Sequence, residues 1–316
     1  MSNCVQSMKR DSQNMFVQMH EDQLKSKLVS EEFVLELFKV EAYELFLNRA
    51  DGFRGSLLIQ ACRALCNYLG LGTERNKTLW TDILTGEVIQ ELQLISERNP
   101  YAACVLGYAY LHGVKKDGEM LGAVVEDKAR GIELLKYAAD NQIHIAAEPV
   151  ARAYERGDCG LTKDYIAATD YYIKSYSDKN DYRAKLLVGM PEECTNEEYA
   201  WIQEWAQNDD PIAMRTLGIF KLNGHRTAQG VTEGMRMLEA AAERDELLAM
   251  CFVASACCFG MKFNGGAYRT TVNEMSYLHG SVLANRALKL GWEPARALVD
   301  KIDGGRTASE GGKYGL

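Results

Sequence analysis

One short pattern occurs twice in the chain and limits its fold more than any other feature. The segment PYAACVLGYAYLHG at 100–113 is echoed by PIAMRTLGIFKLNG at 211–224, with proline, alanine, leucine and both glycines in the same register. A second match follows each copy, since RGIELLKYAAD at 130–140 aligns with EGMRMLEAAAE at 233–243. Each unit is therefore predicted to be a helix, a loop and a second helix.

Further copies of the unit define a period. Ala151 takes the place of Gly107 in the segment 150–172, and Ala254 lies 36 residues after Gly218. A helix–turn–helix unit that recurs at a fixed period of this size indicates an α-solenoid. The register predicts five helix pairs and a closing helix from residue 100 onward, with extra residues in the loops of the first and last pairs.

The residue types at the repeated positions have physical reasons. Pro100 and Pro211 suit the first position of a helix, where the missing N–H is not needed. Gly107 and Gly218 are small residues at the point where two paired helices must approach closely. Gly113 suits the end of a first helix, because glycine tolerates a positive φ.

The pattern resembles the Sel1-like repeat family, which is related to tetratricopeptide repeats. The resemblance covers residues 100 to about 300 and is weaker in the third and fifth units, where the tyrosine and one or both glycines are missing. It implies an all-α fold, an α–α superhelix (solenoid) of Sel1-like helix-turn-helix repeats. The matching residues are Leu106, Gly107, Tyr110, Gly113, Asp127, Ala138 and Ala139 in the first unit, Ala151, Tyr154, Gly157, Gly160, Leu161, Asp164 and Ala168 in the second, and Leu217, Gly218, Gly224, Gly230 and Val231 in the fourth.

Three regions are predicted along the chain. Residues 1–99 show helical periodicity without the repeat and are interpreted as an N-terminal helical cap, with Ser30 capping its first clear helix. Residues 100–303 form the solenoid. Residues 304–316 are glycine-rich and poor in apolar side chains, which predicts a flexible tail.

The sequence lacks the patterns that catalysis or cofactor binding needs. It contains no HExxH, no phosphate-binding loop, no GxSxG and no SxxK, and its five histidines do not pair at ligand spacing. Its nine cysteines lack zinc-site spacing and are interpreted as free, mostly buried thiols of a reducing cytosol. We therefore expect no catalytic residue, no metal and no cofactor, and an enzyme, such as a hydrolase, is the least favoured function.

Charge and hydropathy limit the kinds of partner that the chain is expected to bind. A net charge of −8 argues against nucleic acid, because binding to phosphates needs a basic surface. The longest uncharged apolar stretch, 247–261, is too short to span a bilayer, and residues 1–23 do not resemble a secretory signal. These observations predict a cytoplasmic protein that binds neither nucleic acid nor membrane.

The resemblance implies a non-enzymatic protein–protein interaction module, an adaptor or regulator, that binds a protein partner in a concave groove. The alternative is a dedicated inhibitor, an immunity protein that neutralises a bacterial toxin or effector. Arg152 and Arg215 are the cations best suited to hold acidic or C-terminal groups. Positions around each Leu-Gly pair are predicted to line the groove, although Ile219 also suits the core: Tyr108, His112, Glu148, Arg152, Glu155, Arg215, Ile219, Ser255 and Phe259.

Overall fold

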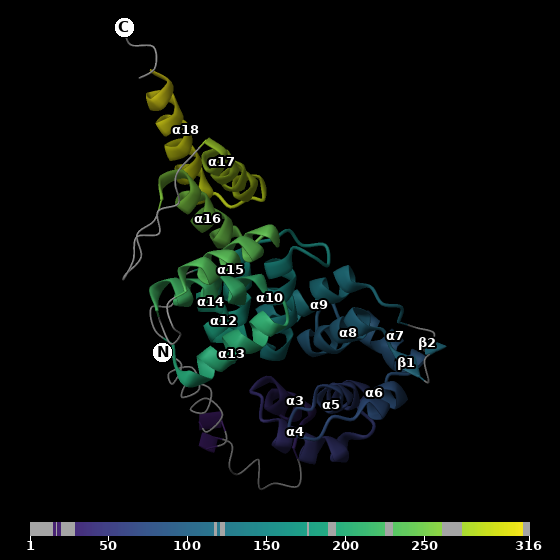
Figure 1. Cartoon of the computed structure of the whole chain (residues 1–316). Helices are drawn as coiled ribbons and strands as arrows, with labels where there is room; N and C mark the ends of the chain where they lie inside the picture. The colour runs from purple at the N-terminus through teal and green to yellow at the C-terminus, as the bar shows by residue number, and fades with distance from the viewer. Residues whose placement is uncertain are drawn as a thin grey trace. The chain divides into compact units, whose positions relative to one another are not determined.

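The structure is a computed structural model that describes residues 15–16, 18–19, 29–116, 119–120, 124–175, 177–188, 194–224, 230–260 and 274–311. It is helical (Figure 1), which confirms the predicted all-α class. Within the described part, the only strands are β1 (Lys115–Lys116) and β2 (Glu119–Met120), which pair antiparallel. The chain divides into two compact units, Met1–Val188 and Gly189–Leu316.

The first unit begins with helices that lie outside the repeat. Ser30 caps the first of them by accepting a hydrogen bond from the Phe33 N–H, as predicted. α3 packs on α4 and α5 packs on α6, so these helices also form consecutive pairs. Their bounds are α3 (Glu31–Lys39), α4 (Tyr43–Ala50), the 3₁₀ turn η1 (Asp51–Phe53), α5 (Leu57–Leu69), α6 (Lys77–Ile83) and α7 (Gly86–Ile95).

The predicted repeats continue the first unit without a break. α8 packs against α9 and α10 against α11, and α12 covers α11. α8 also packs on α5 and α7, so the predicted boundary at residue 99 does not separate two compact units. The bounds are α8 (Pro100–His112), α9 (Lys128–Asp140), the 3₁₀ turn η2 (His144–Ala146), α10 (Ala147–Arg156), α11 (Tyr165–Lys174) and α12 (Asp178–Val188).

The second unit holds the remaining predicted pairs. α14 packs against α15 and α16 against α17, and α18 closes the array against α17 and α16. α18 runs to Gly311, so the predicted tail of residues 304–316 is helical as far as the structure describes it, and the expected boundary at 303 is wrong. The bounds are α13 (Asn196–Gln207), α14 (Pro211–Asn223), α15 (Val231–Glu243), α16 (Leu247–Phe259), α17 (Glu274–Lys289) and α18 (Ala295–Gly311).

Glycines allow the helices of the α8–α9 and α14–α15 pairs to approach each other closely. A Cβ atom added to Gly107 of α8 would lie 2.7 Å from Leu135 Cγ and 3.0 Å from the Gly131 carbonyl oxygen of α9. The same arrangement recurs in the second unit, where a Cβ at Gly218 would lie 2.9 Å from the Gly234 carbonyl oxygen. Such distances leave room for no side chain, which confirms the register found in the sequence.

The helix ends also follow the predicted chemistry. α8 and α14 begin at Pro100 and Pro211, each preceded by a capping side chain, Asn99 or Asp210, that accepts from backbone N–H groups of the first turn. Gly157 ends α10 with a φ of 69° and donates its N–H to the Ala153 carbonyl. Local sequence therefore sets where these helices start and stop.

The insertion after Gly113 is anchored more firmly than the sequence suggests. Val114 and Val124, at its two ends, are buried, and the Val114 N–H donates to the Val124 carbonyl at 3.4 Å. The two ends of this loop therefore contribute to the core. The second predicted insertion, around NGGAYRT at 264–270, lies outside the described residues.

Candidate functional site

A surface cavity of about 450 Å³ lies in the first unit, where α8, α9 and α10 meet the end of α5. We call it the α8–α10 cleft. It brings together four of the predicted site residues, Tyr108, His112, Glu148 and Arg152. The lining is completed by Leu69, Leu111, Lys128, Ile132, Pro149, Ala153, Arg156, Asp158 and Cys159.

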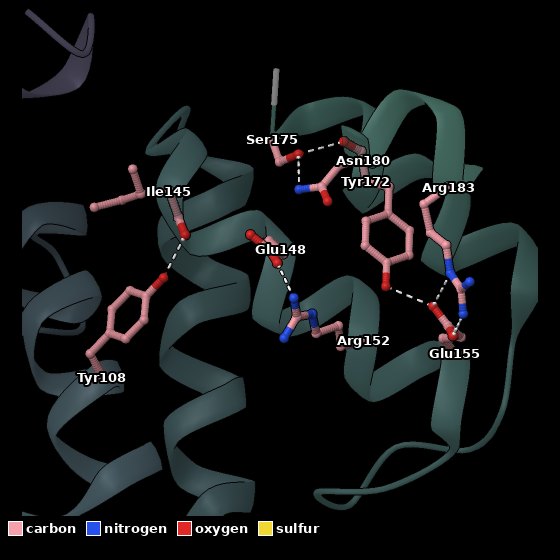
Figure 2. A network of polar contacts seen from close by, with 9 residues as sticks. All are labelled: Tyr108, Ile145, Glu148, Arg152, Glu155, Tyr172, Ser175, Asn180 and Arg183. Atoms are coloured by element: carbon pink, nitrogen blue, oxygen red, sulfur yellow. Dashed lines mark hydrogen bonds and ion pairs between the residues drawn. The ribbon is translucent and has the colours of Figure 1, made fainter. Parts of the chain in front are cut away.

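Tyr108 forms the floor of the cleft. Its ring is buried, and its hydroxyl donates a hydrogen bond to the Ile145 carbonyl at 2.7 Å, as Figure 2 shows. This bond ties α8 to the turn that precedes α10. Burial, and to a lesser extent the nearby Cys104 and Glu148, raise the pKa of Tyr108, so its hydroxyl stays protonated and keeps this donor role.

Tyr108→Phe is expected to lower the free energy of unfolding by about 1 kcal/mol, because the half-buried Ile145 carbonyl loses its donor while the ring stays in place. Urea unfolding followed by circular dichroism measures the change. Tyr110→Phe is the matched control, since that hydroxyl only accepts an exposed bond from Gln93 and its loss should cost little. Equal losses in both variants would contradict a structural role for Tyr108.

A row of aromatic rings extends from Tyr108 and His112, which line the cleft, to Tyr68 and Trp80 beside it. The rings of Tyr108 and His112 stack with centroids 6.2 Å apart, and His112 lies 5.8 Å from Tyr68 of α5. Tyr68 in turn stacks on Trp80 at 4.9 Å, and the Arg75 guanidinium lies 5.5 Å from the Tyr68 centroid. We call Trp80, Tyr68, His112 and Tyr108 the aromatic row.

His112 is held in its neutral form by its surroundings. Partial burial is the main cause that lowers the pKa of His112 below its usual value of 6.5, and the nearby cations Arg75, Lys128 and Lys77 lower it further. Glu126 acts in the opposite direction. The ring therefore carries little positive charge at neutral pH.

Glu148 and Arg152 lie one turn apart on α10 and form an ion pair within the cleft (Figure 2). Their side chains are 39% and 56% exposed. Exposed pairs at this spacing contribute only about 0.3–0.5 kcal/mol. Arg152 is thus positioned by its neighbour but remains accessible to another carboxylate.

Glu155 belongs to a different network on the far side of α10. Its carboxylate accepts a 2.6 Å hydrogen bond from Tyr172 and forms an ion pair with Arg183, whose side chain is 6% exposed against 12% for Glu155 (Figure 2). Asn180 donates to Ser175 nearby at 2.9 Å. The carboxylate is already engaged between α10, α11 and α12, so the predicted binding role of Glu155 is replaced by a structural one.

The predicted residue with the most different environment is Arg215 in the second unit. Its side chain is 1% exposed and lies 3.6 Å from the carboxylate of Glu246, which is 0% exposed. Glu246 also caps α16 by accepting from the Ala249 N–H. The prediction that Arg215 holds a partner is wrong, because its guanidinium is enclosed between α14 and the start of α16.

The other predicted residues of the second unit differ in exposure. Ile219 is buried in the apolar core, which fits the core interpretation given above. Ser255 is half-buried, and Phe259 is exposed at the end of α16, where the Lys301 ammonium lies 4.6 Å from its ring centroid. The α8–α10 cleft lies wholly in the first unit, whereas these residues belong to the second.

The cleft offers binding chemistry of a restricted kind. Among the described residues, no three or more His, Cys, Asp or Glu side chains gather as a metal site would require. The eight cysteines in the described part of the chain are free, and burial raises the pKa of thiols such as Cys62 and Cys104. No helix that the structure describes is both long and apolar enough to cross a membrane.

The comparisons with known proteins give structural matches of low similarity. No family model matches the chain, and no curated protein matches it in sequence. A protective antigen present in uropathogenic Escherichia coli strains, which displays an SLR fold, is 17% identical with a TM-score of 0.33; the match covers 83% of this chain and 52% of the antigen. A Sel1 repeat protein from Oxalobacter formigenes is also 17% identical with a TM-score of 0.33, and that match covers 79% of this chain and 94% of the other.

The first match spans about half of the antigen, and both concern the fold alone. The assignment comes from the chain itself. Its helices pack in consecutive pairs, and the glycines that bring the paired helices together, Gly107 with Gly131 and Gly218 with Gly234, stand at the repeated motif positions. Each of the two units is built of consecutive helix pairs, and the motif positions of these pairs resemble the Sel1-like repeat pattern.

Proposed function

We propose that this protein is a non-enzymatic protein-interaction module, an adaptor or regulator, whose partner binds in the α8–α10 cleft. One observation carries the proposal: the cleft gathers an exposed arginine and an exposed histidine over a buried tyrosine, on helices that are fixed by close packing. Arginine and aromatic residues are the types most enriched where binding energy concentrates in interfaces.

The geometry of the cleft supports this assignment in a second way. Tyr108 is locked to the Ile145 carbonyl, so the floor does not need to reorganise on binding. Arg152 is held only by an exposed ion pair with Glu148 and keeps its charge available. A rigid floor beside an available cation lowers the entropy cost of association.

Arg152→Glu is expected to weaken the complex with the partner by about tenfold or more. The change replaces the accessible cation by a negative charge, which would repel an acidic group of the partner. The partner is first recovered from native cells with the unmodified chain, and its affinity is then measured by calorimetry. Arg130→Glu is the matched control, because Arg130 of α9 also forms an exposed ion pair, with Glu133, but does not line the cleft. A loss in the control without a loss in Arg152→Glu would place the partner elsewhere.

The dedicated inhibitor is the second function that the same measurement tests. The net charge of −8 suits a basic target such as a nuclease site. A tight one-to-one complex with the product of an adjacent gene would favour an immunity protein, whereas several weaker partners would favour the adaptor.

A further inference from the structure

We propose that the α8–α10 cleft recognises a short, extended, acidic segment of its partner. One carboxylate of the segment is held by Arg152 and Arg156, and a second carboxylate lies beside His112. This inference rests on the proposed function and specifies the chemistry of the partner. It is carried by the placement of charge and aromatic surface around the cleft.

The cleft is locally basic on an acidic protein. The chain as a whole has a net charge of −8. Among the lining residues the balance is reversed, because three cations, Lys128, Arg152 and Arg156, outnumber two carboxylates, Glu148 and Asp158. All three cations are exposed, and Arg75 and Lys77 also act on His112, against Glu126.

The internal ion pairs of the cleft do not saturate these cations. Lys128 lies 3.3 Å from Glu126, with side chains 59% and 43% exposed, and Arg152 pairs with the exposed Glu148. Each such pair stabilises the fold by a few tenths of a kcal/mol at most. An incoming carboxylate therefore meets charge that is positioned but little neutralised, and a planar guanidinium can bind it with two hydrogen bonds.

The size of the cleft and the charge around it favour a short peptide over a long polyanion. A cavity of about 450 Å³ falls within the range of roughly 300–1,000 Å³ that small ligands fill. A nucleic acid would extend beyond it onto a protein that is acidic overall, where its phosphates would be repelled. A peptide with a few carboxylates matches the local charge, and its apolar parts can lie on His112, Leu69 and Leu111, which line the cleft.

Proton uptake by His112 gives the proposal a second, independent signature. The pKa of His112 is lowered in the free protein by burial and by Arg75, Lys128 and Lys77, against Glu126. A partner carboxylate beside the ring would raise that pKa in the complex. The other titratable or charged groups that face this region are Tyr68, Tyr108, Glu148, Arg152, Arg156, Asp158 and Cys159.

The sign of the pH dependence follows from the two pKa values. The complex binds the His112 proton more tightly than the free protein, so binding takes up a proton. Affinity is lowest above both pKa values, rises as the pH falls through the value of the complex, and levels off below the value of the free protein. The carboxylates of the segment stay ionised above about pH 5, so the rise belongs to His112.

The test uses the full chain and a fluorescein-labelled hexaglutamate peptide, with fluorescence anisotropy as the readout. Hexaglutamate is expected to bind, and Arg152→Glu and Arg156→Glu are each expected to weaken it about tenfold. Arg130→Glu should have no effect. His112→Gln should remove the gain in affinity between pH 7.5 and pH 6, which a merely structural role of the ring would leave in place. Circular dichroism verifies that each variant is folded. If Arg156→Glu does not fold, Arg156→Gln takes its place.

Three results would overturn the proposal. The first is the absence of hexaglutamate binding. The second is equal weakening by Arg130→Glu, and the third is tighter binding of a single-stranded hexathymidylate with the same sensitivity to Arg152→Glu. The broader function is tested separately, because loss of the native partner in Arg152→Glu, without hexaglutamate binding, would keep the cleft as the partner site and reject only its acidic chemistry.

Discussion

Arg183→Ala is expected to lower the free energy of unfolding by about 3–5 kcal/mol, the largest loss of any single change considered in this protein. Arg183 of α12 donates to both oxygens of the Glu155 carboxylate, with Nε 3.3 Å from Oε2. Glu155 is only 12% exposed, so truncation of Arg183 leaves a poorly hydrated negative charge between the helices. Tyr172 alone, a neutral donor at 2.6 Å, does not replace a guanidinium.

The cost should come from the unpaired charge and not from the removal of the pair. Glu155→Gln combined with Arg183→Met is therefore expected to recover most of the loss. Urea unfolding followed by circular dichroism gives the free energies, and hydrogen exchange of the peptides covering α10, α11 and α12 localises the effect. Arg130→Ala is the control, because its exposed pair with Glu133 should contribute little. A double variant as unstable as Arg183→Ala would contradict the argument.

The helix pairs could be predicted from the sequence because their determinants are local and repeated. Gly107 and Gly131 mark the close approach in one unit, and Gly218 and Gly234 mark it in another, so the register alone identifies which helices pack together. Proline, the capping residues and the terminal glycines add the bounds of each helix. No long-range information is needed to recognise such a unit.

Exposure at a given repeat position could not be predicted in the same way. Tyr108, Arg152 and Ile219 occupy the same position, directly after the small residue of the motif, yet only Arg152 is exposed. Cys104 and Arg215 share another position and are both buried, the second through its pair with Glu246. The register fixes the face of the helix, whereas the neighbouring elements decide how much of that face is covered.

Two sets of contacts in the first unit involve residues that the repeat register does not identify. Arg183 lies in the degenerate third unit, where the motif is lost, so its pairing with Glu155 left no signal in the sequence. Tyr68 and Trp80 lie before residue 100, outside the repeat, and join His112 in the aromatic row because α5 packs on α8 and on α6. These contacts join segments that are distant in the chain, and single-sequence patterns do not report them.

The glycine contacts lead to the second large expected effect. Gly131→Ala is expected to lower the free energy of unfolding by about 2–3 kcal/mol, because both nearest neighbours of the new Cβ are backbone atoms. The Gly107 carbonyl oxygen and the Leu111 nitrogen would each lie 2.9 Å away, so α8 and α9 must separate. This loss is expected although helix propensity by itself favours alanine over glycine by about 1 kcal/mol.

Two comparisons distinguish crowding from a general effect of the substitution. Gly107→Ala should cost less than Gly131→Ala, since its closest neighbour is the side-chain Cγ of Leu135 at 2.7 Å, which can rotate. Gly86→Ala, in α7 with nothing within 4 Å of the new Cβ, should leave the unfolding free energy unchanged or raise it slightly. Urea unfolding of the three variants measures this order. If Gly131→Ala were as stable as Gly86→Ala, α8 and α9 would not be in the close contact on which the repeat assignment depends.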